Sequence, residues 1–289
     1  MVKSFQVVVT GASGFVAKNL RKYLSENNVN LISISRNDFK TYKNEQKIIS
    51  KDYDEKIIVK KIKNSDVLIH LVGIGKQSID TDYEMINVEL TKHIVNLVKK
   101  TKIKKIVYNS GLGVSSKTSV GYFISKYKAE KIIINSGLNY TIFRPSYIVG
   151  KDDLFTKFLK KQIKIKTIEI PGSGKYSIQP ISINDVVKII FQSFNEIKFK
   201  NKICDLVGPD YLTFEQYVKL FCKGSKIKIK KINLETAYYD AINNKNSNFG
   251  IDDLNILVGD FKGNYNQLEK ITQIKFESVI ELLKSGRLL

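Results

Sequence analysis

Two residues separated by one helical turn give the first indication of chemistry. In the stretch GYFISKYKAE, residues 121–130, Tyr122 and Lys126 are four positions apart and share one face of a predicted helix. A lysine ammonium beside a phenol lowers the phenol pKa, so that the phenol can give or take a proton. The pair therefore predicts acid–base chemistry on a substrate oxygen; a tyrosine that only packs is the alternative.

A glycine-rich turn near the start of the chain could bind phosphate groups. In VVVTGASGFVAKNL, residues 7–20, Gly11, Gly14 and Ala17 form a G-x-x-G-x-x-A pattern between a predicted strand and a predicted helix. Glycine permits the tight turn and the close approach of a pyrophosphate, and the helix N-terminus offers free N–H groups. We expect a dinucleotide here, bound by Gly11, Ser13, Gly14, Phe15 and Val16.

The end of the second predicted strand favours one cofactor. An acidic residue at this place would bind the ribose 2′-hydroxyl of NAD, whereas arginine suits the 2′-phosphate of NADP. The chain has Arg36 after Ser35, and Asp38 lies beyond the expected position. We therefore predict NADP(H) in preference to NAD(H); the alternative is a surface arginine without a role.

Strands and helices alternate through the first half of the chain. Apolar runs at 6–11, 30–35, 66–73, 104–111 and 139–150 have the composition of strands, and segments 14–26, 82–99 and 121–137 have helical spacing. This alternation predicts an α/β fold, a doubly wound parallel sheet of the Rossmann type, over residues 1–150. Residues 151–289 form a smaller, mixed C-terminal lobe, with segments near 180–208 returning to the Rossmann domain. We expect little regular structure at 237–250.

Several motifs, in the same order along the chain, resemble the short-chain dehydrogenase/reductase superfamily, in its extended or atypical branch. They are TGASGFVAKNL, DVLIHLVG, NVELTKHIVNLV, YFISKYKAE and FRPSYIVG. Within it, HLVGI, NSGLGV, PISINDVV, DLVGPDYLTFEQYV and the tail FGIDDLNILVGDFKGNYNQLEKIT resemble the group of nucleotide-binding accessory subunits of respiratory complex I. The resemblance implies that Leu71, Val72, Gly73 and Pro145 also contact the cofactor and that Lys126 binds its ribose.

One position departs from the superfamily pattern. The resemblance implies a catalytic serine at the end of the fifth strand, but VYNSGLG places Gly111 there and Ser110 one residue before it. Losing such a donor costs roughly 10²–10³ in rate; Ser110 could replace it only if the loop turned it inward. Our leading interpretation is an NADP(H)-dependent oxidoreductase acting on a carbonyl or carbinol carbon through Tyr122 and Lys126. The alternatives are a catalytically silent nucleotide-binding or redox-sensing protein, and a sugar-nucleotide epimerase or dehydratase.

The formal net charge of +20 raises the question of a polyanionic partner. Of the 48 basic residues 44 are lysine and only four are arginine, and the lysines are scattered. Proteins that read phosphates or bases tend to use arginine forks, so we expect no specific nucleic-acid site. No apolar run approaches the roughly 20 residues that span a bilayer. Peripheral association with a membrane or with complex I is compatible with the resemblance.

The two cysteines, Cys204 and Cys222, have no metal-type spacing, and we expect reduced thiols, no metal site and a cytoplasmic protein. The sequence does not identify the small-molecule substrate.

Overall fold

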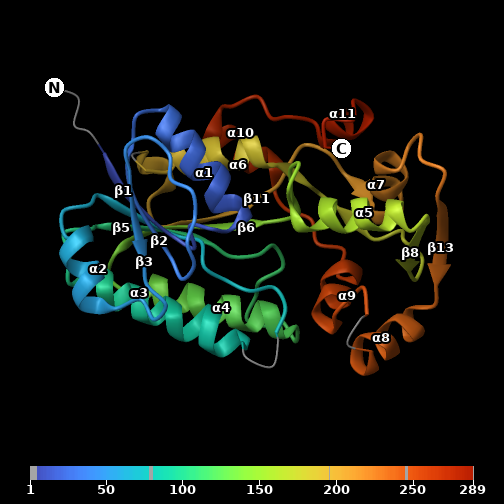
Figure 1. Ribbon diagram of the computed structural model, residues 1–289, viewed down its shortest axis with the longest axis horizontal. Coiled ribbons are helices and arrows are strands. Elements are labelled where there is room, and N and C mark those ends of the chain that lie inside the picture. The colour runs from blue at the N-terminus through green and yellow to red at the C-terminus, as the bar shows by residue number, and fades with distance from the viewer. Residues whose placement is uncertain (1–4, 78–80, 195, 245–246, 289) are drawn as a thin grey trace.

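The computed structural model describes residues 5–77, 81–194, 196–244 and 247–288, and its centre is a seven-stranded sheet (Figure 1). All six pairs of neighbouring strands are parallel, which confirms the predicted doubly wound α/β fold. The strand order is β11-β6-β5-β4-β1-β2-β3. Because the order reverses between β1 and β4, a crevice opens there at the carboxyl ends of the strands, where ligands of such sheets bind. The strands are β1 (Gln6–Thr10), β2 (Asn30–Ser35), β3 (Glu45–Ile49), β4 (Val67–His70), β5 (Lys105–Asn109), β6 (Asn139–Pro145) and β11 (Lys202–Leu206).

Helices cover both faces of this sheet (Figure 1). One face carries α1 (Phe15–Glu26), α6 (Ile183–Gln192) and α10 (Tyr265–Thr272), and the other carries α2 (Glu55–Ile62), α3 (Leu90–Lys99) and α4 (Gly121–Ile134). Successive strand residues point to opposite faces, so Val7 and Val9 enter one core and Val8 the other. A short π-helix, η1 (Glu84–Glu89), runs directly into α3, where the sequence predicted one continuous helix.

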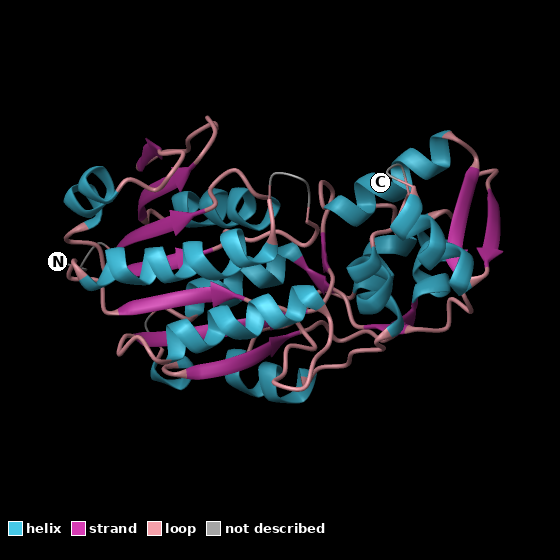
Figure 2. Cartoon of the chain, turned by 90° about the horizontal axis from the view of Figure 1, so that it is seen from below, coloured by secondary structure: helices cyan, strands magenta, loops and turns pink. Residues whose placement is uncertain are grey.

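Most of the remaining elements form a smaller lobe beside the carboxyl edge of the sheet, and Figure 2 shows the two lobes side by side. Its third apolar core includes Leu159, Ile170, Phe214 and Leu282. The elements that complete the fold are β7 (Ile148–Val149), α5 (Leu154–Lys164), β8 (Thr167–Pro171), β9 (Ser177–Ile178), β10 (Ile181–Ser182), η2 (Ile197–Phe199), β12 (Leu212–Thr213), α7 (Phe214–Phe221), β13 (Lys228–Ile232), α8 (Leu234–Asn243), α9 (Ile251–Val258) and α11 (Val279–Lys284). The short helix η2 instead packs with the sheet of the first lobe, through Phe199.

The chain passes between the two lobes more than once. After β6 it enters the smaller lobe, then returns so that α6 packs on α1 and β11 pairs with β6. It leaves again, and α10 comes back against β11 before α11 ends in the smaller lobe. The carboxyl edge of the sheet is therefore enclosed by segments that are far apart in sequence.

Besides η1, other elements differ from the sequence-based expectation. Strands β3 and β13 were not predicted, and α8 occupies much of the segment 237–250 for which little regular structure was expected. Residues 245–246 of that segment lie outside the described residues. Of the described helices, none combines the length and apolar character needed to cross a membrane.

Candidate functional site

The glycine-rich turn joins β1 to α1 in a conformation that only glycine adopts easily. Gly11 has φ +72°, and a Cβ there would lie 2.9 Å from the carbonyl carbon of Leu71. The Gly14 N–H donates to the Gly11 carbonyl at 2.9 Å, and α1 begins at Phe15. The first N–H groups of α1 therefore face the crevice, as an anion-binding helix start requires. The turn fits a dinucleotide pyrophosphate.

Hydroxyl groups connect this turn to the end of β2. The Ser35 hydroxyl, which is buried, donates to the Ser13 hydroxyl at 3.1 Å. Arg36 follows and is exposed, so it is accessible to a ligand lying over the turn. The Asp38 carboxylate is held by Lys47 at 2.5 Å, which lowers the Asp38 pKa. Asp38, the first acidic residue after β2, is thus paired with a lysine and lies beyond the position from which a carboxylate would bind a ribose hydroxyl.

Two further residues support the turn and were not found from the sequence. The buried guanidinium of Arg21 donates to the Ala12 carbonyl at 2.7 Å and forms an ion pair with buried Glu45. Tyr53 is buried in a left-handed conformation, with φ +53°. Burial raises the pKa of Tyr53 to about 12, opposed by a hydrogen bond from the Gly11 backbone and by Arg36. No local pattern marks either residue, because both act across loops.

Tyr122 and Lys126 lie on α4, as predicted. The buried Lys126 ammonium donates to the Asn109 carbonyl at 3.1 Å and the Tyr108 hydroxyl at 3.3 Å, and lies 5.8 Å from the Tyr122 ring centroid. Burial lowers the pKa of Lys126 to about 8, although Glu130 opposes this. Burial raises the pKa of Tyr122 to about 12, the opposite direction from that expected of a phenol beside a lysine ammonium. At neutral pH the phenol therefore holds a proton that it can donate, and most of the lysine is charged.

The loop after β4 passes directly over Lys126. A Cβ on Gly73 would lie 2.8 Å from the Lys126 Nζ atom, so only glycine fits beside that ammonium. Buried Asn87, in η1, clamps the next residue of the loop: it accepts from the Ile74 N–H at 2.9 Å and donates to the Ile74 carbonyl at 3.1 Å. Its amide also donates to the Ser125 hydroxyl at 3.0 Å. Asn87 thus ties the loop after β4, which contains Leu71, Val72 and Gly73, to helix α4.

The end of β5 brings Ser110 and Gly111 to the same place. A Cβ on Gly111 would lie 3.4 Å from the Tyr122 hydroxyl oxygen, the position from which a serine could share a substrate oxygen with the tyrosine. The Ser110 Oγ atom is buried and has no hydrogen-bond partner among the described residues. Buried hydroxyls normally have partners, so the Ser110 Oγ atom is an unsatisfied polar atom beside Gly111.

Ser110, Gly111 and Tyr122 line a cavity of about 270 Å³ at the junction of the two lobes. The first lobe contributes Ser110, Gly111, Tyr122 and Pro145 among others, and the smaller lobe contributes Ser177, Ile178, Asp253, Ile256 and Phe261. Within the described ranges, no cluster of His, Cys, Asp or Glu could hold a metal ion. Cys204 and Cys222 are both buried and unbridged.

The smaller lobe also contacts the helix that carries the tyrosine. The Asp252 carboxylate, on α9, accepts a hydrogen bond from the Tyr122 backbone N–H at 3.1 Å. This carboxylate satisfies one of the free N–H groups at the start of α4, which has no side-chain cap of its own. Asp252 belongs to the tail motif of the family resemblance, but that motif did not indicate this contact, because 130 residues separate the two partners.

Comparison with known proteins agrees with this geometry. A family model described as NAD(P)H-binding matches residues 11–186, well over half of the chain. A mitochondrial protein of Dictyostelium discoideum, NADH dehydrogenase [ubiquinone] 1 alpha subcomplex subunit 9, is 24% identical over 239 residues, 78% of this chain and 65% of that protein. The Mus musculus protein of the same name is 25% identical over 170 residues, 58% of this chain and 45% of its own length.

The chain therefore spans under two-thirds of these relatives. Among solved structures, a UDP-glucuronic acid 4-epimerase of Bacillus cereus, in complex with NAD, superposes with a TM-score of 0.77 at 16% identity, covering 98% of this chain and 99% of that one. That likeness establishes the fold alone. The resemblance inferred from the sequence motifs is confirmed, and the chain belongs to the NAD(P)H-binding family.

Proposed function

We propose that this protein is an NADP(H)-dependent oxidoreductase that reduces a carbonyl compound, with Tyr122 as the proton donor. The observation that carries the proposal is the meeting of Tyr122, Ser110 and Pro145 in one cavity, with Lys126 beside it. The glycine-rich turn lies at the same carboxyl edge of the sheet. A dinucleotide bound along that edge would extend from Arg36 to Lys126.

The residues divide the chemistry as follows. A bound nicotinamide supplies the hydride that adds to the carbonyl carbon. The electron pair of the C=O bond moves to oxygen, and the Tyr122 hydroxyl gives its proton to that oxygen, so the product is an alcohol. The Lys126 ammonium stabilises the phenolate that remains until water returns a proton to it. Ser110 would have to turn its buried Oγ atom toward the cavity to hold the substrate oxygen.

The preference for NADP(H) rests on Arg36. It is exposed beside the turn, and the neighbouring Asp38 is bound by Lys47. A hydrogen bond to a charged group contributes roughly 1.5–3 kcal/mol, so Arg36→Ala should remove about tenfold or more of NADPH affinity and leave NADH affinity unchanged. Calorimetric titration of both cofactors checks this. Tighter binding of NADH by the wild-type protein would contradict the preference.

Tyr122→Phe tests the catalytic role. Removing a general acid costs about 10²–10⁴ in rate, so NADPH oxidation at 340 nm should almost vanish while NADPH still binds. Tyr127→Phe is the matched control, because Tyr127 lies on the same helix but does not line the cavity. Equal rates for Tyr122→Phe and wild type, across aldehydes, ketones and quinones, would exclude the assignment.

A second function is favoured by a specific observation. Gly111 stands where a catalytic serine would lie, and the sequence relatives named above are subunits of NADH dehydrogenase. The second candidate is therefore a protein that binds the nucleotide without turnover and associates with a respiratory complex. Tight NADPH binding with no substrate oxidising it, together with co-purification with complex I subunits, would favour this candidate over the reductase.

A further inference from the structure

The cavity beside Tyr122 differs in charge from the rest of the chain. Lys and Arg make up 48 of the 289 residues, yet none of the fifteen residues lining the cavity is basic. The one charged residue in the lining is an acid, Asp253. Lys126, just outside, directs its ammonium to the Asn109 carbonyl and the Tyr108 hydroxyl. The cavity wall therefore carries no positive charge to face an anionic substrate.

The four arginines are all placed elsewhere. Arg21 pairs with Glu45 under the glycine-rich turn, and Arg144 pairs with Glu130. Arg36 follows β2 and Arg287 follows α11, and neither lines the cavity. A pyrophosphate group carries two negative charges and needs cationic side chains or helix N-termini close by. No cationic side chain lines the substrate side of this cavity. The two helix starts that border it, those of α4 and α9, already donate N–H groups to the carboxylates of Asp252 and Asp253.

The remaining lining is apolar or neutral. Phe123 and Phe261 meet edge to face, with ring centroids 5.1 Å apart, and Leu112, Ile178 and Ile256 extend this wall. The volume of about 270 Å³ lies just below the roughly 300–1,000 Å³ of common ligand pockets. The size and the aromatic wall suit a small, compact molecule.

Asp253 makes the cavity electrostatically unfavourable for anions. Its carboxylate accepts from the Gly250 N–H at 2.8 Å, which fixes its position at the start of α9. Burial raises the pKa of Tyr147, another lining residue, and the negative charge of Asp253 raises it further. The charge of this exposed carboxylate thus acts on a second residue of the cavity lining.

We propose that the cavity selects small, uncharged, mainly apolar carbonyl compounds and rejects anions, including nucleoside diphosphate sugars. This inference rests on the proposed reductase function, whose site it specifies. Asp253 is the residue that sets the charge selection, and the aromatic wall supplies the affinity.

A matched pair of aldehydes tests the selection. Methyl 4-formylbenzoate is uncharged, and 4-carboxybenzaldehyde has the same ring and aldehyde but carries a carboxylate. With NADPH, the ester should show kcat/KM about tenfold or more above that of the acid. Asp253→Lys should abolish or reverse this ratio, and Asp253→Asn, which keeps an acceptor for the Gly250 N–H, should reduce it. Glu26→Lys, an equal charge change at the exposed far end of α1, should leave the ratio unchanged.

Binding is measured separately from turnover, by saturation-transfer NMR on the full chain with NADP⁺. Signals from the ester, but not from the acid or UDP-glucose, support the selection even when no aldehyde is reduced; the reductase function alone then fails. Binding of UDP-glucose or the acid as tightly as the ester overturns the selection, as does a ratio that Asp253→Lys does not change. Failure of the ester both to bind and to react overturns it as well.

Discussion

Gly111 lies against the proposed proton donor, and we expect its missing side chain to limit the rate of the proposed reaction. Its φ lies outside the left-handed region, so a serine there needs no unusual backbone conformation. The added Cβ would lie 3.2 Å from the Tyr122 Cε1 atom, so the ring must shift by a few tenths of an ångström. Gly111→Ser should raise kcat about tenfold or more, because it restores a donor to the substrate oxygen.

The measurement is NADPH oxidation with a substrate that the wild type reduces slowly. Gly113→Ser is the contrasting control: Gly113 has φ +100°, and its Cβ would lie 2.8 Å from the Phe261 ring, so this variant should melt at a lower temperature without a gain in rate. A Gly111→Ser protein that is well folded and no faster would show that the missing hydroxyl is not what limits turnover.

Lys126 should give the reaction an alkaline limit. Burial lowers its pKa to about 8, so its charge is present below that pH and is lost as the pH rises through it. Since the charged ammonium stabilises the Tyr122 phenolate, kcat/KM should fall above about pH 8. Lys105 is the matched control, because burial also lowers its pKa to about 8. It is the first residue of β5 and so lies at the amino ends of the strands, away from the cavity. If Lys105→Met removed the fall in kcat/KM above about pH 8, the alkaline limit would belong to Lys105 and not to Lys126.

Local spacing identified the residues whose partners are nearby in sequence. Gly11 and Gly14 form one turn, and Tyr122 and Lys126 share one helix face, so their positions follow from backbone geometry. Asn87 is the first residue of NVELTKHIVNLV, one of the motifs of the family resemblance. Its hydrogen bonds to Ile74 and Ser125 join residues up to 38 positions apart, which no local sequence pattern indicates. Asp252 and Asp253 belong to the tail motif of the resemblance, but their contacts with α4 and the cavity were not predicted, because only the docking of the smaller lobe brings α9 there.

At the level of elements, α4 depends on a carboxylate from the other lobe. Asp252→Ala removes the acceptor for the Tyr122 N–H, and such caps contribute about 1 kcal/mol. We expect a modest loss of thermal stability and a clearly larger loss of kcat, because the start of α4 carries the proton donor.

Asp153→Ala separates these two effects. Asp153 is buried and caps α5, where its carboxylate accepts from the Thr156 N–H at 2.9 Å, but it does not line the cavity. Loss of the Asp153 cap should lower stability by at least as much and leave kcat nearly unchanged. Thermal melts and steady-state kinetics on both variants make the comparison; a parallel loss of kcat in both would reduce Asp252 to a structural cap.

The elements that sequence analysis missed are those whose stability comes from pairing. Strand β3 has only one buried residue, Ile48, and β13 has none, so neither shows the continuous apolar run of a central strand. Each is held by its parallel neighbour, β2 or β8. The π-helix η1 also escaped prediction, since its apolar positions resemble those of an ordinary helix.

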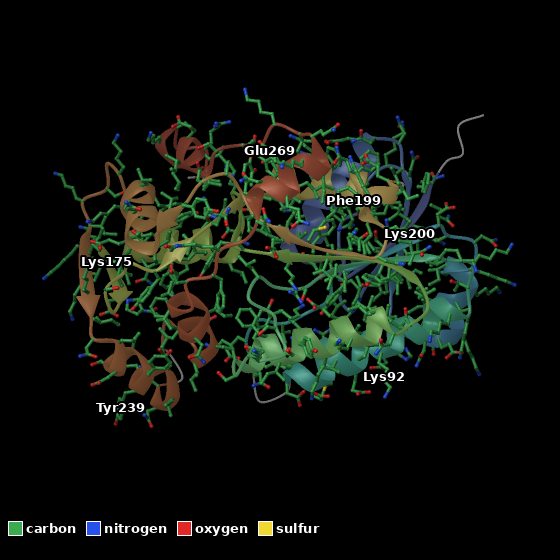
Figure 3. The ribbon with its side chains drawn as sticks, turned by 180° about the vertical axis from the view of Figure 1, so that it is seen from behind. Lys92, Lys175, Phe199, Lys200, Tyr239 and Glu269 are labelled. Carbon is green, nitrogen blue, oxygen red and sulfur yellow. The ribbon has the colours of Figure 1, made fainter. Side chains whose placement is uncertain are left out.

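At the scale of the whole molecule, the charge of +20 is spread over the surface. Lys92, Lys175 and Lys200 project from different elements at well-separated places (Figure 3). Binding to a DNA duplex should be weak, independent of sequence, and reduced steeply between about 50 and 200 mM salt. Fluorescence anisotropy with two unrelated duplexes measures this. Sub-micromolar binding to one of them alone at about 150 mM salt would reveal a specific site.

The repeated passage of the chain between the lobes has a consequence for its synthesis on the ribosome. The free edge of β6 is covered only when residues 202–206 emerge, and the apolar face of α1 is complete only with Leu268 of α10. At roughly 5–20 residues per second, the nascent sheet waits several seconds with an open edge and an exposed apolar face. A nascent chain halted near residue 150 would therefore be a substrate for chaperones, because the nucleotide-binding lobe closes only after most of the polypeptide has been made.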